Sequence, residues 1–208
     1  MEEAAPAPVR VLMLCGSLQS RSSNRAALDV ASDLSTASGA AVETFERLAE
    51  LPAFDPDRAD EPDAVAAEWQ AQVGRADAVL VAAPEYAGGL AGAVKNALDW
   101  LVAAGSLYRR PVAVMSAGTT GGRHALVEMA QTVTWQGAYV VSTLGIAAPR
   151  SKSDEQGRFT DAPTLAAIGA LTEDLLGAAS SSGAEVALTA QHVVGGLGID
   201  AAHVTPPA

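Results

Sequence analysis

The feature that most constrains the fold is a regular alternation of short apolar runs with segments whose apolar residues recur at helical spacing. Five apolar runs predict strands, at 9–14, 41–46, 77–83, 111–116 and 139–146. Helical segments follow them, from about 24–38, from 61 onward, and at about 91–104, 123–136 and 163–179. Since 77–83 is apolar on both faces, it is typical of a central parallel strand. With right-handed crossovers, the pattern predicts a three-layer α/β fold whose five-stranded parallel sheet has the order 2-1-3-4-5.

The chain divides into one core domain with a segment at each end. Its 208 residues, of which 49% are apolar, suffice for a single domain with a full core. Residues 1–8 are acidic and proline-rich, which predicts a disordered lead before the domain at 9–179. Residues 180–208 are rich in glycine, serine and alanine. They are expected to form a partly mobile C-terminal extension outside the core.

Charge and cysteine content exclude several classes of protein. A net charge of −11 argues against binding to nucleic acid, which requires a basic face. The single cysteine, Cys15, excludes an internal disulfide framework and a cysteine-based zinc site, and no metal site is expected. No run approaches the roughly 18 to 20 apolar residues of a membrane span, so no membrane insertion is expected. The N-terminal residues do not resemble a signal peptide, and the expected location is cytoplasmic.

Three unusual loops follow strands that are neighbours in the predicted sheet. They lie at 16–23, 84–90 and 117–122, after the first, third and fourth strands. Ligands of such folds bind beyond the carboxyl ends of the strands. We therefore expect the three loops to meet at one binding site.

The first loop has the composition of a phosphate site. Hydroxyl and amide side chains and one arginine lie beside the start of a helix, where unpaired N–H groups attract anions. The loop lacks the glycines and the lysine of triphosphate and dinucleotide motifs, which favours a terminal monophosphate. The candidate residues are Ser17, Arg21, Ser22, Ser23 and Asn24. The alternative is that one of the last three simply caps the helix.

The second loop is suited to a flat ligand. Pro84 fixes the backbone, and Gly88 and Gly89 allow a ring to approach the chain closely. The alternative is an ordinary turn from strand to helix.

Two stretches of the chain carry a resemblance to a known family. Pro84-Glu85-Tyr86, followed by Gly92-Ala93-Val94-Lys95-Asn96-Ala97-Leu98-Asp99-Trp100-Leu101, resembles the signature of the NADPH-dependent FMN reductases. This family includes bacterial quinone, chromate and azo-dye reductases, and the first loop resembles its phosphate loop. The resemblance implies a flavodoxin-like fold, FMN as cofactor, NADPH or NADH as reductant, and a homodimer or homotetramer.

The resemblance also implies roles for individual residues. Ser17, Ser22 and Asn24 would hold the FMN phosphate, and the second loop would line the isoalloxazine ring. Glycine-rich backbone of the third loop would approach the pyrimidine end of that ring. The residues expected in these two loops are Pro84, Glu85, Tyr86, Ala87, Gly88, Ser116, Gly118, Thr119 and Gly121.

The chain departs from the family pattern at two positions. Gln19 stands where the family has an arginine, so either Arg21 supplies the positive charge for the phosphate or the phosphate is held less tightly. Ala87 stands where the family has an asparagine, which removes one side-chain contact to ring or substrate. Both departures leave the choice of substrate open.

Several other polar or aromatic residues have simpler interpretations. Lys95 and Asp99, four residues apart on one helix, are expected to pair with each other rather than take part in chemistry. Trp100 is expected in the core or at a subunit interface. Arg123 at a helix start is a candidate for an NADPH phosphate. The three histidines, His124, His192 and His203, are expected at the surface.

The sequence thus predicts an FMN-dependent NAD(P)H oxidoreductase, in which the flavin carries the chemistry and no side chain acts as a catalytic residue. Its acceptor would be a small molecule, such as a quinone, free flavin, azo dye or metal oxyanion, reduced by a ping-pong mechanism. Two alternatives are a flavodoxin-type one-electron carrier, which would suit the acidic charge, and a non-enzymatic regulator with the same fold.

Overall fold

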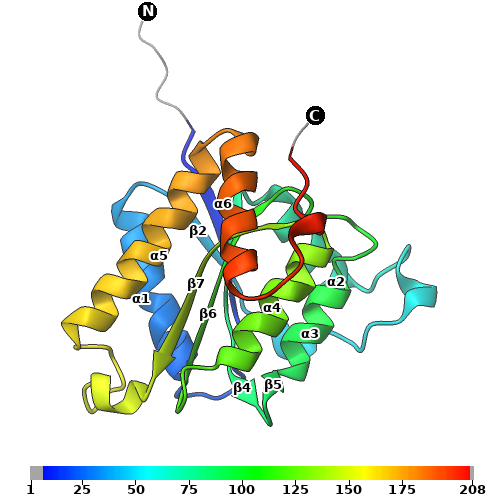
Figure 1. Cartoon of the computed structure of the whole chain (residues 1–208). Helices are drawn as coiled ribbons and strands as arrows, with labels where there is room; N and C mark the ends of the chain where they lie inside the picture. The colour runs from blue at the N-terminus through cyan, green and yellow to red at the C-terminus, as the bar shows by residue number, and fades with distance from the viewer. Residues whose placement is uncertain (1–6, 207–208) are drawn as a thin grey trace, which may run out of the picture.

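Five parallel strands form the central sheet of the computed structural model, which describes residues 7–206 (Figure 1). The strand order is β2-β1-β3-β6-β7. Because β6 and β7 are the fourth and fifth strands of this sheet along the chain, the predicted order 2-1-3-4-5 is confirmed. The strands are β1 (Arg10–Cys15), β2 (Ala41–Phe45), β3 (Ala78–Ala82), β6 (Pro111–Gly118) and β7 (Tyr139–Ala147). Most of the expected lead at 1–8, and residues 207–208, lie outside the described residues.

Helices cover both faces of this sheet (Figure 1). On one face lie α1 (Ser23–Ala37) and α5 (Ala162–Ser180), which also contact each other. The other face carries α2 (Ala64–Arg75), α3 (Gly92–Asp99) and α4 (Arg123–Trp135). All five residues of β3 are buried between the two layers, as expected for a central strand. No helix among the described residues is long and apolar enough to cross a membrane.

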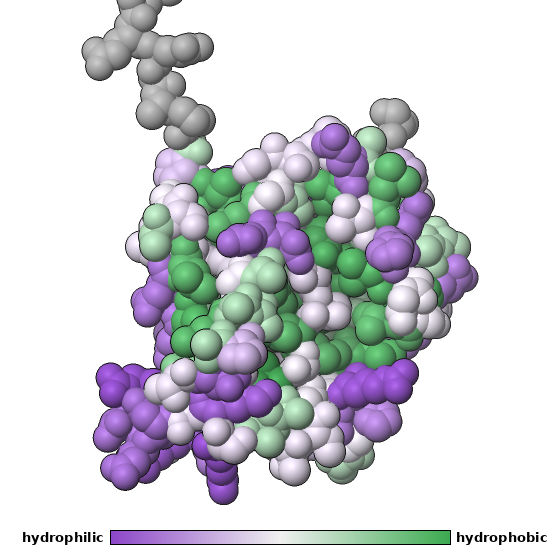
Figure 2. Space-filling model, turned by 60° about the vertical axis from the view of Figure 1, so that its left-hand side comes forward, coloured by the Kyte–Doolittle hydropathy of each residue, from purple (hydrophilic) through white to green (hydrophobic). Residues whose placement is uncertain are grey.

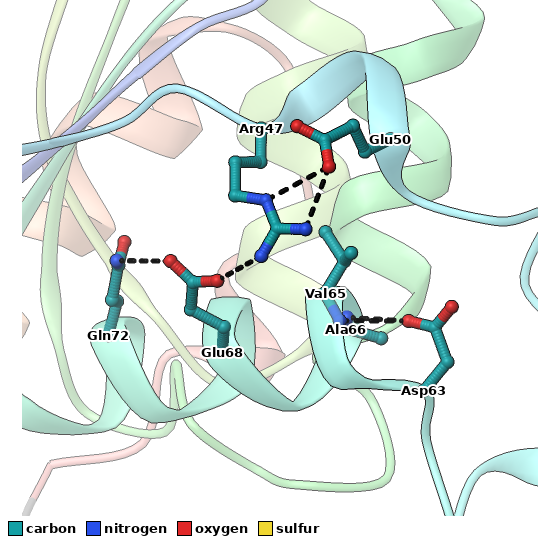
Figure 3. Close-up of polar contacts among 7 residues, drawn as sticks. All are labelled: Arg47, Glu50, Asp63, Val65, Ala66, Glu68 and Gln72. Atoms are coloured by element: carbon teal, nitrogen blue, oxygen red, sulfur yellow. Dashed lines mark hydrogen bonds and ion pairs between the residues drawn. The ribbon is translucent and has the colours of Figure 1, made fainter.

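Side chains at the helix starts explain where the helices begin. Ser22, Asp63 and Asp161 precede α1, α2 and α5. Ser22 and Asp63 each accept from two backbone N–H groups of the first turn, and Asp161 accepts from one. Arg47 adds a link between the β2–α2 connection and α2 by bonding both Glu50 and Glu68 (Figure 3). These contacts orient α2 beside the sheet.

Helix α3 is shorter than the periodicity predicts, because it ends at Asp99 rather than near residue 104. Beyond that point the N–H groups of Leu101 and Val102 bond carbonyls three residues back, at Leu98 and Asp99. This tighter winding turns Leu101 into the core, where it is almost fully buried. Burial of Leu101 is thus compatible with an earlier end of the α-helix than the spacing of apolar residues predicts.

A two-stranded hairpin, which the sequence did not predict, makes up most of the second loop. It pairs β4 (Glu85–Tyr86) with β5 (Gly89–Leu90) in antiparallel register. The two turn residues, Ala87 and Gly88, have φ angles of +51° and +76°. Two successive positive φ angles define a type I′ turn, which asparagine and glycine favour and alanine disfavours. An asparagine at this position, as in the family pattern, would therefore suit the turn better than Ala87 does.

The C-terminal segment packs against the sheet, which differs from the expected extension outside the core. Helix α6 (Gly183–Gly196) lies along β7 and buries Val186, Ala190 and Val194 (Figure 1). Beyond it, the carbonyl oxygen of Thr205 accepts a 2.7 Å hydrogen bond from the Tyr139 hydroxyl. Small side chains in 180–206 permit this close packing of α6 on β7. The same small residues that suggested a mobile segment therefore allow it to pack against the sheet.

Candidate functional site

A cleft of about 580 Å³ lies at the carboxyl ends of the strands. The carboxyl ends of the strands lie at the lower end of the molecule in Figure 1, and in Figure 2 hydrophilic residues gather most densely at the lower left. Ten of the expected site residues line the cleft, and they come from all three predicted loops. They are Ser17, Arg21, Ser22, Ser23, Asn24, Pro84, Glu85, Tyr86, Gly118 and Thr119.

Gly16 allows the first loop to pass close to Val94 of α3 as the loop leaves β1. Its N–H donates to the Ala82 carbonyl at 2.7 Å, which continues the sheet by one bond. A Cβ atom on Gly16 would lie 2.3 Å from Cγ2 of Val94 and 2.8 Å from Cβ of Ala83. Any larger residue would therefore push the loop away from the cleft.

The first turn of α1 provides hydrogen-bond donors to the cleft. The Ser22 hydroxyl oxygen accepts from the N–H groups of Asn24 and Arg25 at 3.2 and 3.4 Å. Ser22 thus acts as a helix cap, while its own O–H can still donate to a ligand. The Ser23 N–H has no acceptor within residues 7–206. The capping and phosphate-binding interpretations of this loop are therefore compatible.

Asn24 joins the first and third loops. Its amide nitrogen donates to the Ala117 carbonyl at 3.1 Å, and its amide oxygen accepts from the Ala117 N–H at 2.8 Å. The side chain is only 3% exposed. Because both polar atoms are engaged by β6, we assign Asn24 a positioning role in place of the direct phosphate contact that the resemblance implies.

Glu85 joins the second loop to α4. Its carboxylate accepts a 2.8 Å hydrogen bond from the His124 N–H and a 3.4 Å bond from the Ala125 N–H. Helix α4 has no other side-chain cap, because Gly122 precedes it. Desolvation raises the pKa of Glu85, but the N–H groups of His124 and Ala125 together with the nearby His124 side chain lower it by more, so the net pKa lies below the ordinary value.

Glu85 is expected to make stability depend on pH in acid. A carboxyl group with a lowered folded pKa stabilises the fold fully above its unfolded pKa of about 4.3, and this contribution is lost as pH falls through the folded pKa. Glu85→Gln should therefore lower Tm at pH 7, and its difference from wild type should shrink below about pH 4. Thermal melts from pH 7 to pH 3 measure this. The exposed Glu43→Gln is the control, and a Glu85→Gln difference independent of pH would contradict the assignment.

Four expected residues do not line the cleft. Ala87 and Gly88 form the tip of the β4–β5 hairpin, and Gly121 lies in the turn before α4 with φ at +85°. Ser116 is fully buried, and a Cβ on Gly122 would lie only 1.9 Å from its hydroxyl oxygen. These residues shape the loops, and we assign them no direct contact to a ligand.

The structure adds a fourth loop that the sequence analysis missed. Ala148, Pro149, Arg150 and Ser151 follow β7 and complete the lining of the cleft, together with Gln19 and Ala117. The Ala148 N–H donates to the Gly118 carbonyl at 3.1 Å, which ties this loop to the third one. The sequence does contain a signal for this loop, which is Arg150. It is a cation in a loop that follows a parallel strand and therefore lies at the binding edge of the sheet.

The family signature on α3 serves the fold. Lys95 and Asp99 form the expected pair at 2.6 Å. The Asn96 side chain donates to the Pro52 carbonyl at 2.8 Å and accepts from the Phe54 N–H at 2.7 Å. Trp100 is fully buried, so it lies in the core, which was one of its two expected locations along with a subunit interface. The signature therefore anchors a loop on the helical layer, away from the cleft.

The remaining candidates lie at the surface or outside the cleft. Arg123 is exposed and does not line the cleft. His124 is exposed beside Glu85, and His203 stacks on Trp135 with ring centroids 4.6 Å apart.

The donors and shape of the cleft fit FMN. Ligand pockets typically enclose about 300–1,000 Å³, a range that includes this cleft. Ser17, Ser22 and Arg21 could hold a phosphate at the N-terminus of α1, where the helix dipole favours an anion. Pro84, Tyr86 and Gly118 offer apolar and backbone surface to a flat ring.

Relatives with sequence similarity are reductases. A family model described as NADPH-dependent FMN reductase matches residues 9–152. An NAD(P)H-dependent FMN reductase of Pseudomonas aeruginosa, PA1204, is 32% identical over 161 residues, covering 74% of this chain and 85% of that protein. An NADPH:quinone oxidoreductase of Arabidopsis thaliana is 29% identical over 167 residues, covering 75% and 84%.

A solved structure shares the fold. The flavoenzyme NAD(P)H:acceptor oxidoreductase FerB of Paracoccus denitrificans superimposes with a TM-score of 0.67 at 21% identity. The match covers 81% of this chain and 96% of FerB. It supports the flavodoxin-like architecture.

Proposed function

The chain belongs to the NADPH-dependent FMN reductase family, whose members use FMN and NAD(P)H, and we propose that it reduces small molecules by a ping-pong mechanism. The acceptor is a quinone, free flavin, azo dye or metal oxyanion. One observation carries the proposal: a single cleft of about 580 Å³ joins the phosphate-type loop to a ring-sized surface. Reductant and acceptor would enter this cleft in turn.

The chain's own residues would bind FMN, orient it and shield it from water. FMN, when bound, supplies hydride-transfer chemistry, so the protein needs no acid or base of its own. Ser17, Ser22 and Arg21 hold the phosphate. Buried Pro84 lines the cleft with a backbone of fixed φ, and Tyr86, which is 58% exposed, limits access of water.

We also propose that the chain forms a homodimer or homotetramer. Tyr86, Val102 and Tyr108 are each more than half exposed at different places on the surface, and each is a candidate for contact with a second copy. Light scattering at several concentrations measures the assembly.

Reconstitution with FMN tests the function. Purified protein incubated with FMN and desalted should show the flavin absorbance bands, and it should oxidise NADPH when a quinone is present. Flavin binding without NADPH oxidation would favour an electron carrier instead. Failure to retain flavin would favour a non-enzymatic regulator, and either outcome contradicts the proposal.

Arg21→Ala should weaken FMN binding by about 10-fold or more, since it removes a charge-assisted hydrogen bond to the phosphate. Quenching of flavin fluorescence measures the Kd. Riboflavin, which lacks the phosphate, should bind both proteins alike, and Arg58→Ala, outside the cleft, is the matched control. Unchanged FMN affinity would leave the helix dipole and the hydroxyl groups as the anchor.

A further inference from the structure

A second hollow, which we name the basic groove, adjoins the cleft. It has a volume of about 490 Å³ and lies between the start of α1 and the loop after β7. Its cationic residues are Arg21, Arg25, Arg150 and Arg158. Cleft and groove share a wall made of Gln19, Arg21, Ser22, Ser23 and Arg150. A ligand in the cleft could therefore extend into the groove.

Two of the four arginines are free to bind an anion. Arg25 pairs with Glu46 at 2.6 Å, and Arg158 pairs with Asp154 at 2.8 Å. Arg21 and Arg150 form no ion pair or side-chain hydrogen bond with any residue in 7–206, and both lie in the shared wall. Asp29 and Glu155 also line the groove, so its cations exceed its acids by only one.

The wall that carries Arg150 is rigid. Asp154 accepts hydrogen bonds from the N–H groups of Gln156 and Arg158 at 3.0 and 2.9 Å, which closes a tight turn. The Thr160 N–H donates to the Lys152 carbonyl at 2.9 Å, and Phe159 anchors the turn in the core. Arg150 is thus presented from an ordered loop, which reduces the entropy lost when it binds a ligand.

We propose that the basic groove binds the 2′-phosphate of NADPH, and that Arg150 makes the chain select NADPH over NADH. This inference rests on the proposed function. The two reductants differ only by that phosphate, which a guanidinium can bind through two parallel hydrogen bonds. The first turn of α1 already supplies donors for the FMN phosphate. The groove next to it offers a second cation for a second phosphate.

The first test uses a fragment of NADPH and does not depend on turnover. Isothermal titration of the FMN-loaded protein should show adenosine 2′,5′-bisphosphate binding at least 10-fold more tightly than 5′-AMP. Arg150→Gln should remove most of this difference, and Arg150→Lys should restore part of it because the charge returns. Equal affinities of the two nucleotides for the wild-type protein would overturn the proposal.

The second test is the ratio of kcat/KM for NADPH to kcat/KM for NADH. Arg150→Gln should lower this ratio by about 10-fold or more. Arg123→Gln is the matched control, because that exposed arginine lies outside cleft and groove. It should change the ratio by less than about 2-fold.

The outcomes separate this inference from the proposed function. If Arg150→Gln weakens FMN binding 10-fold and leaves the ratio unchanged, Arg150 serves the FMN phosphate and the inference is overturned. If the ratio responds to Arg123 instead, it is overturned as well. If the wild-type protein oxidises neither reductant, the proposed function itself fails.

Discussion

Replacement of Trp100 by alanine is expected to lower the free energy of unfolding by about 3–5 kcal/mol. The ring is fully buried and meets Phe54 edge to face, with centroids 5.2 Å apart. Its indole N–H donates to the Pro52 carbonyl at 2.9 Å. Truncation would leave a cavity between α3 and the loop before α2, and urea denaturation would measure the loss.

Two further variants isolate the cause. Trp100→Phe keeps most of the apolar contact, and the Pro52 carbonyl still accepts from Asn96, so we expect a loss of about 1–2 kcal/mol. Trp135→Ala removes a tryptophan that is 63% exposed, and it should lower the free energy of unfolding by less than about 1 kcal/mol. Comparable losses for Trp100→Ala and Trp135→Ala would show that burial of Trp100 is not what stabilises this region.

Asn24→Ala is expected to lower the free energy of unfolding by about 2–6 kcal/mol and to raise the Kd for FMN at least 10-fold. It would leave the buried N–H and C=O of Ala117 without partners, at about 1–3 kcal/mol each. The first and third loops would then lose the link that holds them around one cleft. Urea denaturation measures the first effect, and flavin fluorescence titration at a temperature where the variant is folded measures the second.

Ser35→Ala is the matched control for Asn24. Ser35 is also buried on α1, but its hydroxyl bonds only the Ala31 carbonyl of its own helix. Removal of this hydroxyl should lower the free energy of unfolding by less than about 1 kcal/mol and leave FMN affinity unchanged. A folded Asn24→Ala protein with wild-type FMN affinity would refute the positioning role.

Local sequence patterns predicted those parts of the fold that depend on local chemistry. The apolar run ending at Leu14 and the buried strand near Val79 can each be recognised over a few residues, because burial of a strand acts at short range. The β4–β5 hairpin was missed because Ala87 has an unfavourable turn conformation that surrounding contacts impose. Helix α6 was missed because small apolar residues carry weak periodicity until they meet β7.

For the site, the sequence by itself determined the chemistry: hydroxyl groups and an arginine beside a helix start, a proline-bounded loop, and a family whose cofactor is FMN. Only the tertiary structure decided what each residue does there. It turned Asn24 and Glu85 toward backbone groups of distant elements, buried Ser116, and brought Arg150 to the wall beside Arg21. The physical reason is that donors and charges are properties of single residues. Whether they face a ligand or another part of the chain depends on contacts between segments that lie far apart in the sequence, as Arg21 and Arg150 do.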